Sequence, residues 1–256
     1  MIKAIFFDID GTILDGHNGI PKSTQIALAK LREKGIKTII CTGRGYSETK
    51  PLNLEGFDDY ILLNGQICYD DNDNVVFKKS IKDKEKLIEL FNSKKFPFGL
   101  IDEKESYLNM IDDYVIHVHD SINLTLPEVK EYDGKDLYQA LAYGKVKDYI
   151  EQELPNFLAV SWHFDGVDIV PKDGGKDKGI IEYCNLKNID INDTMAFGDG
   201  DNDIEMLKTV GIGVVMGNSI DTVKAVADYV TDSIREDGVY NALVHFGVID
   251  DQDDIF

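Results

Sequence analysis

Apolar and polar positions alternate in blocks along the chain, and the blocks predict strands and helices in turn. The N-terminal run KAIFFD is almost entirely apolar after its lysine, which is typical of a strand buried on both faces. STQIALAKLREKG carries apolar residues at helical spacing, so it predicts a helix capped by Ser23 or Thr24 and ended by Gly35. IKTIIC and DYILL read as two further buried strands. This order indicates a parallel sheet covered by helices.

The same alternation returns near the C-terminus. TMAFGD, IGVVMG and YVT read as strands, and DIEMLKTV and SIDTVKAVA between them read as helices. The two ends of the chain, residues 1–81 and 173–256, therefore predict one doubly wound, Rossmann-like α/β domain with a parallel sheet.

The middle of the chain, residues 82–172, has a different pattern. Helical KDKEKLIELFNSK comes first, and short strand candidates follow it: FGLI, SYLNM, LYQALAY, LAVSWH and DIVP. Two more helical stretches, IDDYVIHVHD and KVKDYIEQEL, separate these strands. Short strands interleaved with helices predict a small α+β domain inserted into the first domain.

Composition narrows the classes of function. The chain has 256 residues, is 43% hydrophobic and carries a net charge of −20 at pH 7. Such an acidic protein repels nucleic acid and anionic membranes, so neither is expected as a partner. The apolar runs are too short to span a bilayer, and the N-terminus reads as a core strand and not as a signal peptide. Three scattered cysteines, Cys41, Cys68 and Cys184, fit free thiols in a reducing cytoplasm.

Polar residues directly follow four of the predicted strands: Asp8 and Asp10, Thr42 and Gly43, Asn64 and Gly65, and Asp199. Asp-Gly and Asn-Gly pairs are common turn formers, which accounts for one or two of these positions. In an open parallel sheet, however, ligands bind beyond the carboxyl ends of the strands. Four strand ends with polar groups therefore predict a binding site at that edge.

The acids among these residues favour a metal site. In a strand, residues two apart face the same side, so Asp8 and Asp10 are expected to point at one place. Converging with Asp199, these carboxylates would raise one another's pKa unless a cation joined them. Oxygen-only ligands favour magnesium, against the alternative of solvated turn acids.

The few basic residues are placed to attract an anion. Lys176 lies after a Gly-Gly bend and just before a predicted helix, where its ammonium and the helix N-terminus both favour negative charge. Arg44 follows Thr42 and Gly43, whose hydroxyl and N–H groups suit phosphate oxygens. Lys178 is an alternative to Lys176. Cations beside a metal site are consistent with binding of a phosphate ester.

The motifs DIDGT (8–12), TGR (42–44), NG (64–65), the lysine before KGI, and FGDGDND (197–203) resemble the haloacid dehalogenase superfamily. More narrowly, they resemble its Cof-type phosphatases of subclass IIB. The resemblance implies that Asp8 is the nucleophile and that Asp10 is the general acid and then the general base. It implies that Mg²⁺ is bound by the Asp8 side chain, the Asp10 backbone carbonyl and Asp199, with Asp203 in support.

The resemblance also implies a phosphate site and its neighbourhood. Its phosphate-binding residues are Ile9, Thr42, Gly43, Lys176 and Asn202. Arg44 and Asn64 are further candidates near the substrate. Many relatives have a lysine followed three residues later by a small residue and then an aliphatic one; Lys176 fits this spacing and Lys178 does not. Trp162 and His163 are candidate substrate contacts, although a core tryptophan and a solvated histidine are the simpler interpretation.

The position of the insertion implies a class II cap. The link from Thr12 to Ser23 is too short to hold a domain, whereas the stretch from Asn64 to Lys176 is long enough.

The expected function is a magnesium-dependent phosphatase acting on a small phosphorylated metabolite, such as a sugar phosphate. A phosphomutase of the same subclass needs arginines in its cap, and residues 87–171 contain none. A dehalogenase does not need Asp10. A phosphorylatable switch module, the alternative from another class, is about half this length.

Overall fold

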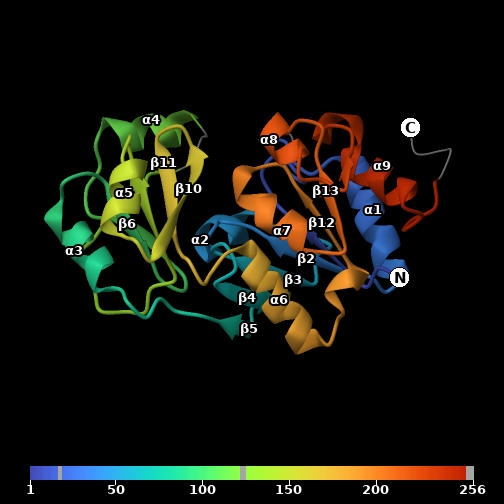
Figure 1. The fold of residues 1–256 in the computed structure, drawn as a ribbon, viewed down its shortest axis with the longest axis horizontal. Helices are drawn as coiled ribbons and strands as arrows, with labels where there is room; N and C mark the ends of the chain where they lie inside the picture. The colour runs from blue at the N-terminus through green and yellow to red at the C-terminus, as the bar shows by residue number, and fades with distance from the viewer. Residues whose placement is uncertain (17–18, 122–124, 252–256) are drawn as a thin grey trace.

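The two ends of the chain form one eight-stranded sheet in the computed structural model, which describes residues 1–16, 19–121 and 125–251 (Figure 1). Its strands from β14 to β3 are parallel, and β4 and β5 extend it as an antiparallel hairpin. In spatial order the strands are β14 (Tyr229–Val230), β13 (Ile212–Val215), β12 (Thr194–Gly198), β1 (Ala4–Phe7), β2 (Lys37–Cys41), β3 (Asp59–Leu62), β4 (Ile67–Asp70) and β5 (Val75–Lys78).

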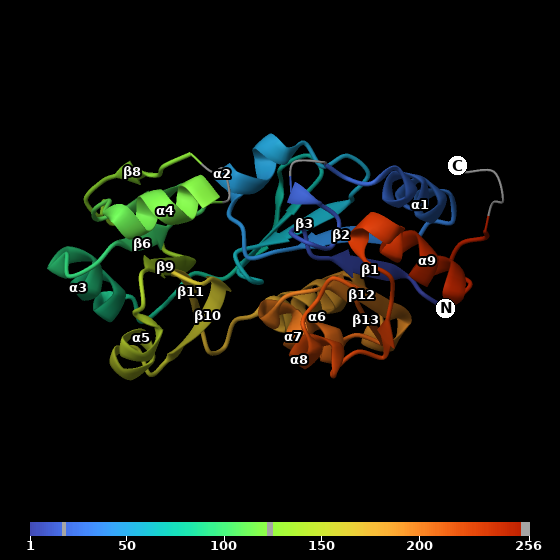
Figure 2. The ribbon, with the colours of Figure 1, turned by 90° about the horizontal axis from the view of Figure 1, so that it is seen from above.

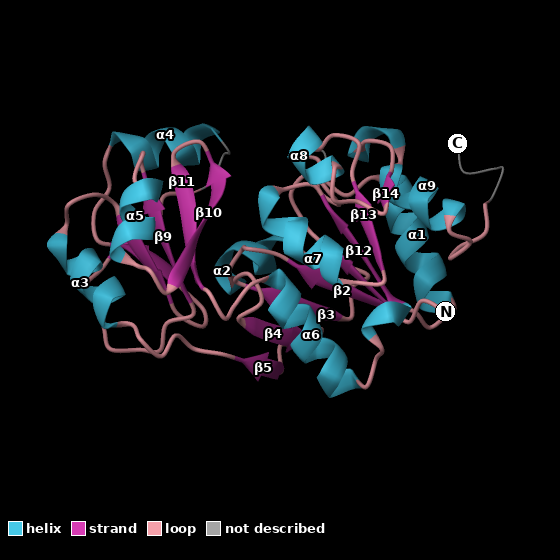
Figure 3. Ribbon diagram, viewed as in Figure 1, coloured by secondary structure: helices cyan, strands magenta, loops and turns pink. Residues whose placement is uncertain are grey.

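Helices cover both faces of this sheet (Figure 3). Ile5 and Phe7 of β1 pack on the side of α1 (Lys22–Glu33) and α9 (Gly238–His245), whereas Phe6 packs on the side of α6 (Lys176–Lys187) and α7 (Ile204–Thr209). Because both faces are buried, the strands read as continuous apolar runs. Shorter helices complete this part: α2 (Tyr46–Thr49), η2 (Lys50–Leu52), η3 (Ile191–Asp193), η4 (Asp201–Asp203), α8 (Asp221–Lys224) and η5 (Ile234–Glu236).

The middle of the chain forms a second, six-stranded sheet beside the first (Figure 2). It is antiparallel except for its last pair, β7 and β8. Helices α3 and α5 pack on one face, and α4 packs on the other. The strands, in spatial order, and the helices are β10 (Phe157–His163), β11 (Gly166–Pro171), β9 (Gln139–Tyr143), β6 (Phe98–Ile101), β7 (Ser106–Leu108), β8 (Glu128–Val129), α3 (Glu85–Ser93), α4 (Asp113–Ser121) and α5 (Lys147–Glu153).

The predicted fold class is confirmed: a doubly wound, mostly parallel sheet carries an inserted α+β part. All strands and helices of the second sheet lie between Glu85 and Pro171, inside the predicted range 82–172. The division into domains with the bounds 1–81, 82–172 and 173–256 stays a prediction. None of the helices in the described ranges combines the length and apolarity needed to cross a bilayer.

Two local predictions differ from the structure. Helix α1 has Pro21 at its N-cap with no side-chain cap, because Ser23 and Thr24 lie inside its first turn and are buried. The hairpin of β4 and β5 was not predicted, although the turn residues DNDN between its strands are a hairpin signal. The cysteines Cys41, Cys68 and Cys184 are buried and form no disulfide, as expected.

Candidate active site

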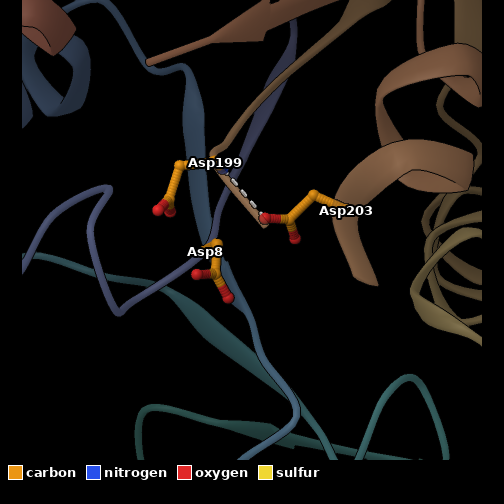
Figure 4. Close-up of side chains that lie close together, drawn as sticks. All are labelled: Asp8, Asp199 and Asp203. Carbon is orange, nitrogen blue, oxygen red and sulfur yellow. Dashed lines mark hydrogen bonds between the residues drawn. The ribbon is translucent and has the colours of Figure 1, made fainter. Parts of the chain in front are cut away.

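The predicted site residues gather at the carboxyl ends of three adjacent strands. Asp8 follows β1, which lies between β12 and β2, and these two strands lead into Asp199 and Thr42. The carboxylates of Asp8, Asp199 and Asp203 come together there, each offering an oxygen within 4.8 Å of the others (Figure 4). Parallel pairing delivers these polar groups to one edge of the sheet, as the sequence predicted.

Lys176 lies inside this acidic cluster. Its Nζ donates to Asp8 Oδ1 at 2.5 Å and to Asp203 Oδ1 at 2.6 Å, and its side chain is only 1% exposed. The other oxygen of Asp203 accepts from the N–H groups of Asp199 and Gly200 at 3.0 and 2.9 Å. Asp203 is therefore occupied by protein donors and holds both Lys176 and the loop that carries Asp199.

Asp199 is oriented by the turn that follows β1. Thr12 Oγ1 donates to Asp199 Oδ1 at 2.8 Å. Gly11 has a φ of +80°, and a Cβ atom at this position would overlap the Asp199 carboxylate. The glycine of DIDGT thus serves both the left-handed turn and the close approach of the acid.

The cluster has the chemistry of a magnesium site. In the described part of the chain, Oδ2 of Asp8 and Oδ2 of Asp199 accept no hydrogen bond, so one oxygen of each carboxylate remains for a cation. Hard oxygen donors with room for water suit Mg²⁺. The residues present therefore fit the ion that the sequence predicts.

Burial makes the negative charges costly. It raises the pKa of Asp8 to about 8, helped by repulsion from Asp203 and opposed by Lys176. Burial also raises the pKa of Asp199 to about 6. For Lys176, burial works to lower the pKa, but the attraction of Asp203 and Asp8 outweighs it and the pKa is raised. A divalent cation between Asp8 and Asp199 would favour the carboxylate that a nucleophile requires.

Donors for an anion lie beside the cluster. The backbone N–H groups of Ile9 and Gly43 donate to no acceptor among the described residues. Thr42 is buried, and its Oγ1 accepts the N–H of Arg44 at 3.2 Å, so the hydroxyl proton remains for a ligand. Asn202 lines a neighbouring cleft of about 480 Å³, whose lining includes Lys176 and Asn64 but not Asp8, Thr42 or Asp199. The donors of Ile9, Thr42 and Gly43 fit the predicted phosphate site.

Asp10 lies differently from the prediction. Strand β1 ends at Phe7, so strand periodicity does not extend to Asp10, which begins a tight turn. Both oxygens of its carboxylate accept from the Arg44 guanidinium at 2.7 Å, and the side chain is 57% exposed. The Asp10 side chain therefore faces Arg44 and not the acidic cluster.

The remaining candidates lie on the side of the second sheet. The Asn64 amide donates to Gln139 and Asp168, both on that sheet. His163 contacts Ser121 and the backbone of Asp165, and its hydrogen bonds among the described residues stay within the predicted cap. Trp162 packs edge-on against Tyr143 and over Gly166 but is 37% exposed, so it is not the fully buried core tryptophan that was expected.

Asp168 and Gln139 are the polar residues that sequence reasoning missed. Both lie on the predicted cap but contact Gly43 or Asn64, which follow strands β2 and β3 at the edge where the phosphate site is predicted. The signal was present, because an aspartate within the apolar strand GVDIVP is a buried charge that needs a partner.

Comparisons with known proteins agree with the fold. Residues 5–243 match the family of haloacid dehalogenase-like hydrolases. The chain is 34% identical to the putative phosphatase YkrA of Bacillus subtilis, over 96% of this chain and 98% of the relative. The solved structure of the phosphatase BT1666 from Bacteroides thetaiotaomicron superposes with a TM-score of 0.89 at 32% identity, covering 97% of this chain and 96% of that one.

A second similar structure belongs to a protein whose subclass and type of substrate are stated. The subclass IIB sugar phosphatase BT4131 superposes with a TM-score of 0.84 at 32% identity, covering 96% of this chain and all of that one. The chain therefore belongs to the haloacid dehalogenase-like hydrolases, and within them it is a Cof-type phosphatase, a phosphoric monoester hydrolase.

Proposed function

We propose that the protein hydrolyses a small phosphorylated metabolite, such as a sugar phosphate, in a magnesium-dependent reaction through an aspartyl-phosphate on Asp8. The observation that carries this proposal is the buried cluster in which Asp8 lies between Lys176 and Asp199. A carboxylate attacks a phosphate dianion only when that charge is neutralised, and Lys176 with a bound cation would neutralise it.

The proposed reaction has two displacements. Asp8 attacks phosphorus, the bond to the leaving oxygen breaks, and Asp10 gives its proton to that oxygen. Asp10 then takes a proton from water as the water attacks phosphorus, which releases inorganic phosphate and regenerates the Asp8 carboxylate. Each step is easier than direct hydrolysis. Because Arg44 holds Asp10 in the present arrangement, the Asp10–Arg44 pair must open for this role.

The side chains of Asp8 and Asp199 and the backbone carbonyl of Asp10 would hold the proposed metal. The ion would supply positive charge where negative charge develops. Ile9, Thr42, Gly43, Lys176 and Asn202 are proposed to hold the phosphate.

The second sheet, with residues 82–172, is proposed to act as a cap that selects the leaving group. Its strand β10 contributes Leu158 and Val160 to the cleft that Lys176 and Asn202 line from the other side. The sugar phosphatase among the structural neighbours supports a sugar phosphate as substrate. The absence of arginine from residues 87–171 favours hydrolysis over a mutase reaction, which must hold a second phosphate.

Release of inorganic phosphate from a panel of phosphorylated sugars, nucleotides and cofactors tests the proposed function. We expect turnover of sugar phosphates above that of nucleotides. Equal turnover of all classes, or none of any, would contradict the proposed substrate.

Chelation tests the metal assignment. We expect EDTA to abolish phosphate release, Mg²⁺ to restore it and Ca²⁺ to fail, because Ca²⁺ takes more ligands in a looser geometry. Phosphate release is measured after dialysis against EDTA and again after each ion is added back. Full activity in EDTA would overturn the metal role of Asp8, Asp10 and Asp199.

A further inference from the structure

Asn64 connects two parts of the proposed phosphate site through its main chain. Its N–H donates to the carbonyl of Thr42 at 3.0 Å, and its carbonyl accepts the N–H of Gly175 at 3.1 Å. Gly175 is the N-cap of α6, directly before Lys176. Asn64 is buried and has a φ of +50°, a left-handed conformation that asparagine tolerates better than most residues. One residue thus holds both the Thr42 loop and the start of the helix that carries Lys176.

The side chain of Asn64 reaches the cap. Its Nδ2 donates to Gln139 Oε1 and to Asp168 Oδ2, both at 2.9 Å. Gln139 begins β9, and Asp168 lies in the neighbouring strand β11. The Gln139 amide donates back to the carbonyl of Gly43 at 3.4 Å. Each amide hydrogen of Asn64 is therefore matched to one acceptor on the second sheet.

This contact is buried and closely packed. Asp168 is 9% exposed and Gln139 is 1% exposed. A Cβ atom on Gly43 would lie 3.0 Å from Asp168 Oδ2 and 3.1 Å from Asn64 Nδ2. The glycine therefore leaves room for the Asp168 carboxylate beside the loop that follows β2. Burial raises the pKa of Asp168 to about 7, and the hydrogen bond from Asn64 opposes this rise. Separating the sheets would take the Asn64 amide away from Asp168 until water replaced it.

We propose that Asn64 is a positioning residue that couples closure of the cap to the geometry of the phosphate site, with Asp168 and Gln139 as its partners on the cap. Its side chain binds the closed cap, and its main chain holds the Thr42 loop and the start of the Lys176 helix. The inference rests on the proposed function, because it gives cap closure a role in phosphoryl transfer. The simpler alternative is that Asn64 only provides a left-handed turn.

A matched pair of variants separates these two roles. Asn53 also has a positive φ, +46°, but it is exposed and its side chain makes no hydrogen bond in the described part of the chain. Asn64→Gly and Asn53→Gly remove the same side chain from the same backbone conformation. We expect Asn64→Gly to lower kcat about tenfold with little change in KM, because fewer bound complexes reach the closed state. Asn53→Gly should leave both constants unchanged.

Substitutions of Asp168 test the partner on the cap. Asp168→Asn keeps an oxygen that accepts from the Asn64 amide, so it should retain most of the activity, whereas Asp168→Leu should match Asn64→Gly. If the two residues act through one contact, the double variant Asn64→Gly/Asp168→Leu should be no slower than either single variant. Effects that multiply in the double variant would overturn the coupling.

Hydrogen exchange gives a readout that does not depend on activity. We expect Asn64→Gly and Asp168→Leu to speed amide exchange about tenfold in segments 42–46, 63–66 and 174–177, with the cap strand 98–101 unchanged. If Asn64→Gly behaves like Asn53→Gly in exchange or in kcat, the positioning role is wrong. If the unaltered protein hydrolyses no phosphate ester, the proposed function is wrong, and so is the role of Asn64 in turnover. In that case the exchange rates alone decide whether Asn64 links the cap to the core loops.

Discussion

Replacing Asp8 with asparagine should reduce phosphate release by at least about 10⁴-fold while the protein stays folded. The amide has nearly the same shape as the carboxylate, but it does not attack phosphorus. Lys176 keeps its bond to Asp203 in the variant, so its charge stays paired in the buried site. We therefore expect a near-native circular dichroism spectrum and a thermal shift on adding Mg²⁺ that is reduced but present.

The measurement is single-turnover and steady-state release of phosphate from one good substrate. Asp71→Asn is the control, because Asp71 is an exposed acid in the turn between β4 and β5. The unaltered protein should also trap a phosphoryl group that is stable in acid and released by hydroxylamine, and Asp8→Asn should not. Residual activity of more than a small fraction in Asp8→Asn would contradict the covalent mechanism.

Much of the site could be predicted because it depends on motifs next to strand ends. Asp8, Thr42 and Asp199 each follow an apolar run, and parallel pairing brings the ends of β1, β2 and β12 to one edge. The alternation of apolar strands and helices was enough to predict a parallel, doubly wound sheet, although not the spatial order of its strands. The positions of these side chains therefore followed from local sequence and the geometry of a parallel sheet.

The features that were missed depend on contacts between distant segments. The orientation of Asp10 is decided by Arg44, which follows a different strand. Asp168 could be assigned to a face of its strand, but its partner Asn64 lies in the other sheet. The N-cap of α1 was misplaced because the helix begins at Lys22, directly after Pro21, so Ser23 and Thr24 lie inside the first turn and cannot cap it. The local sequence carries no information about contacts between side chains that are distant along the chain.

Lys176→Ala should lower kcat about a hundredfold, whereas Lys178→Ala should change it only a few-fold. The ammonium of Lys176 contacts Asp8 at 2.5 Å, and in the proposed reaction it also meets the phosphate, so its largest contribution comes as charge develops in the transition state. A charge-assisted contact of this kind is worth about 3 kcal/mol. The side chain of Lys178 is 54% exposed and pairs with Asp177 at 2.9 Å, which removes it from the cluster.

Stability must be measured beside the kinetics, because Lys176→Ala leaves Asp8 and Asp203 buried without their cation. Breaking a buried ion pair costs about 3–5 kcal/mol, so the variant should unfold at a lower temperature. Excess Mg²⁺ should recover part of that loss through Asp8 but should not restore kcat, since the contact of Lys176 with the phosphate is absent. If Mg²⁺ restored both, or if Lys178→Ala were the impaired variant, Lys176 would have no direct part in phosphoryl transfer.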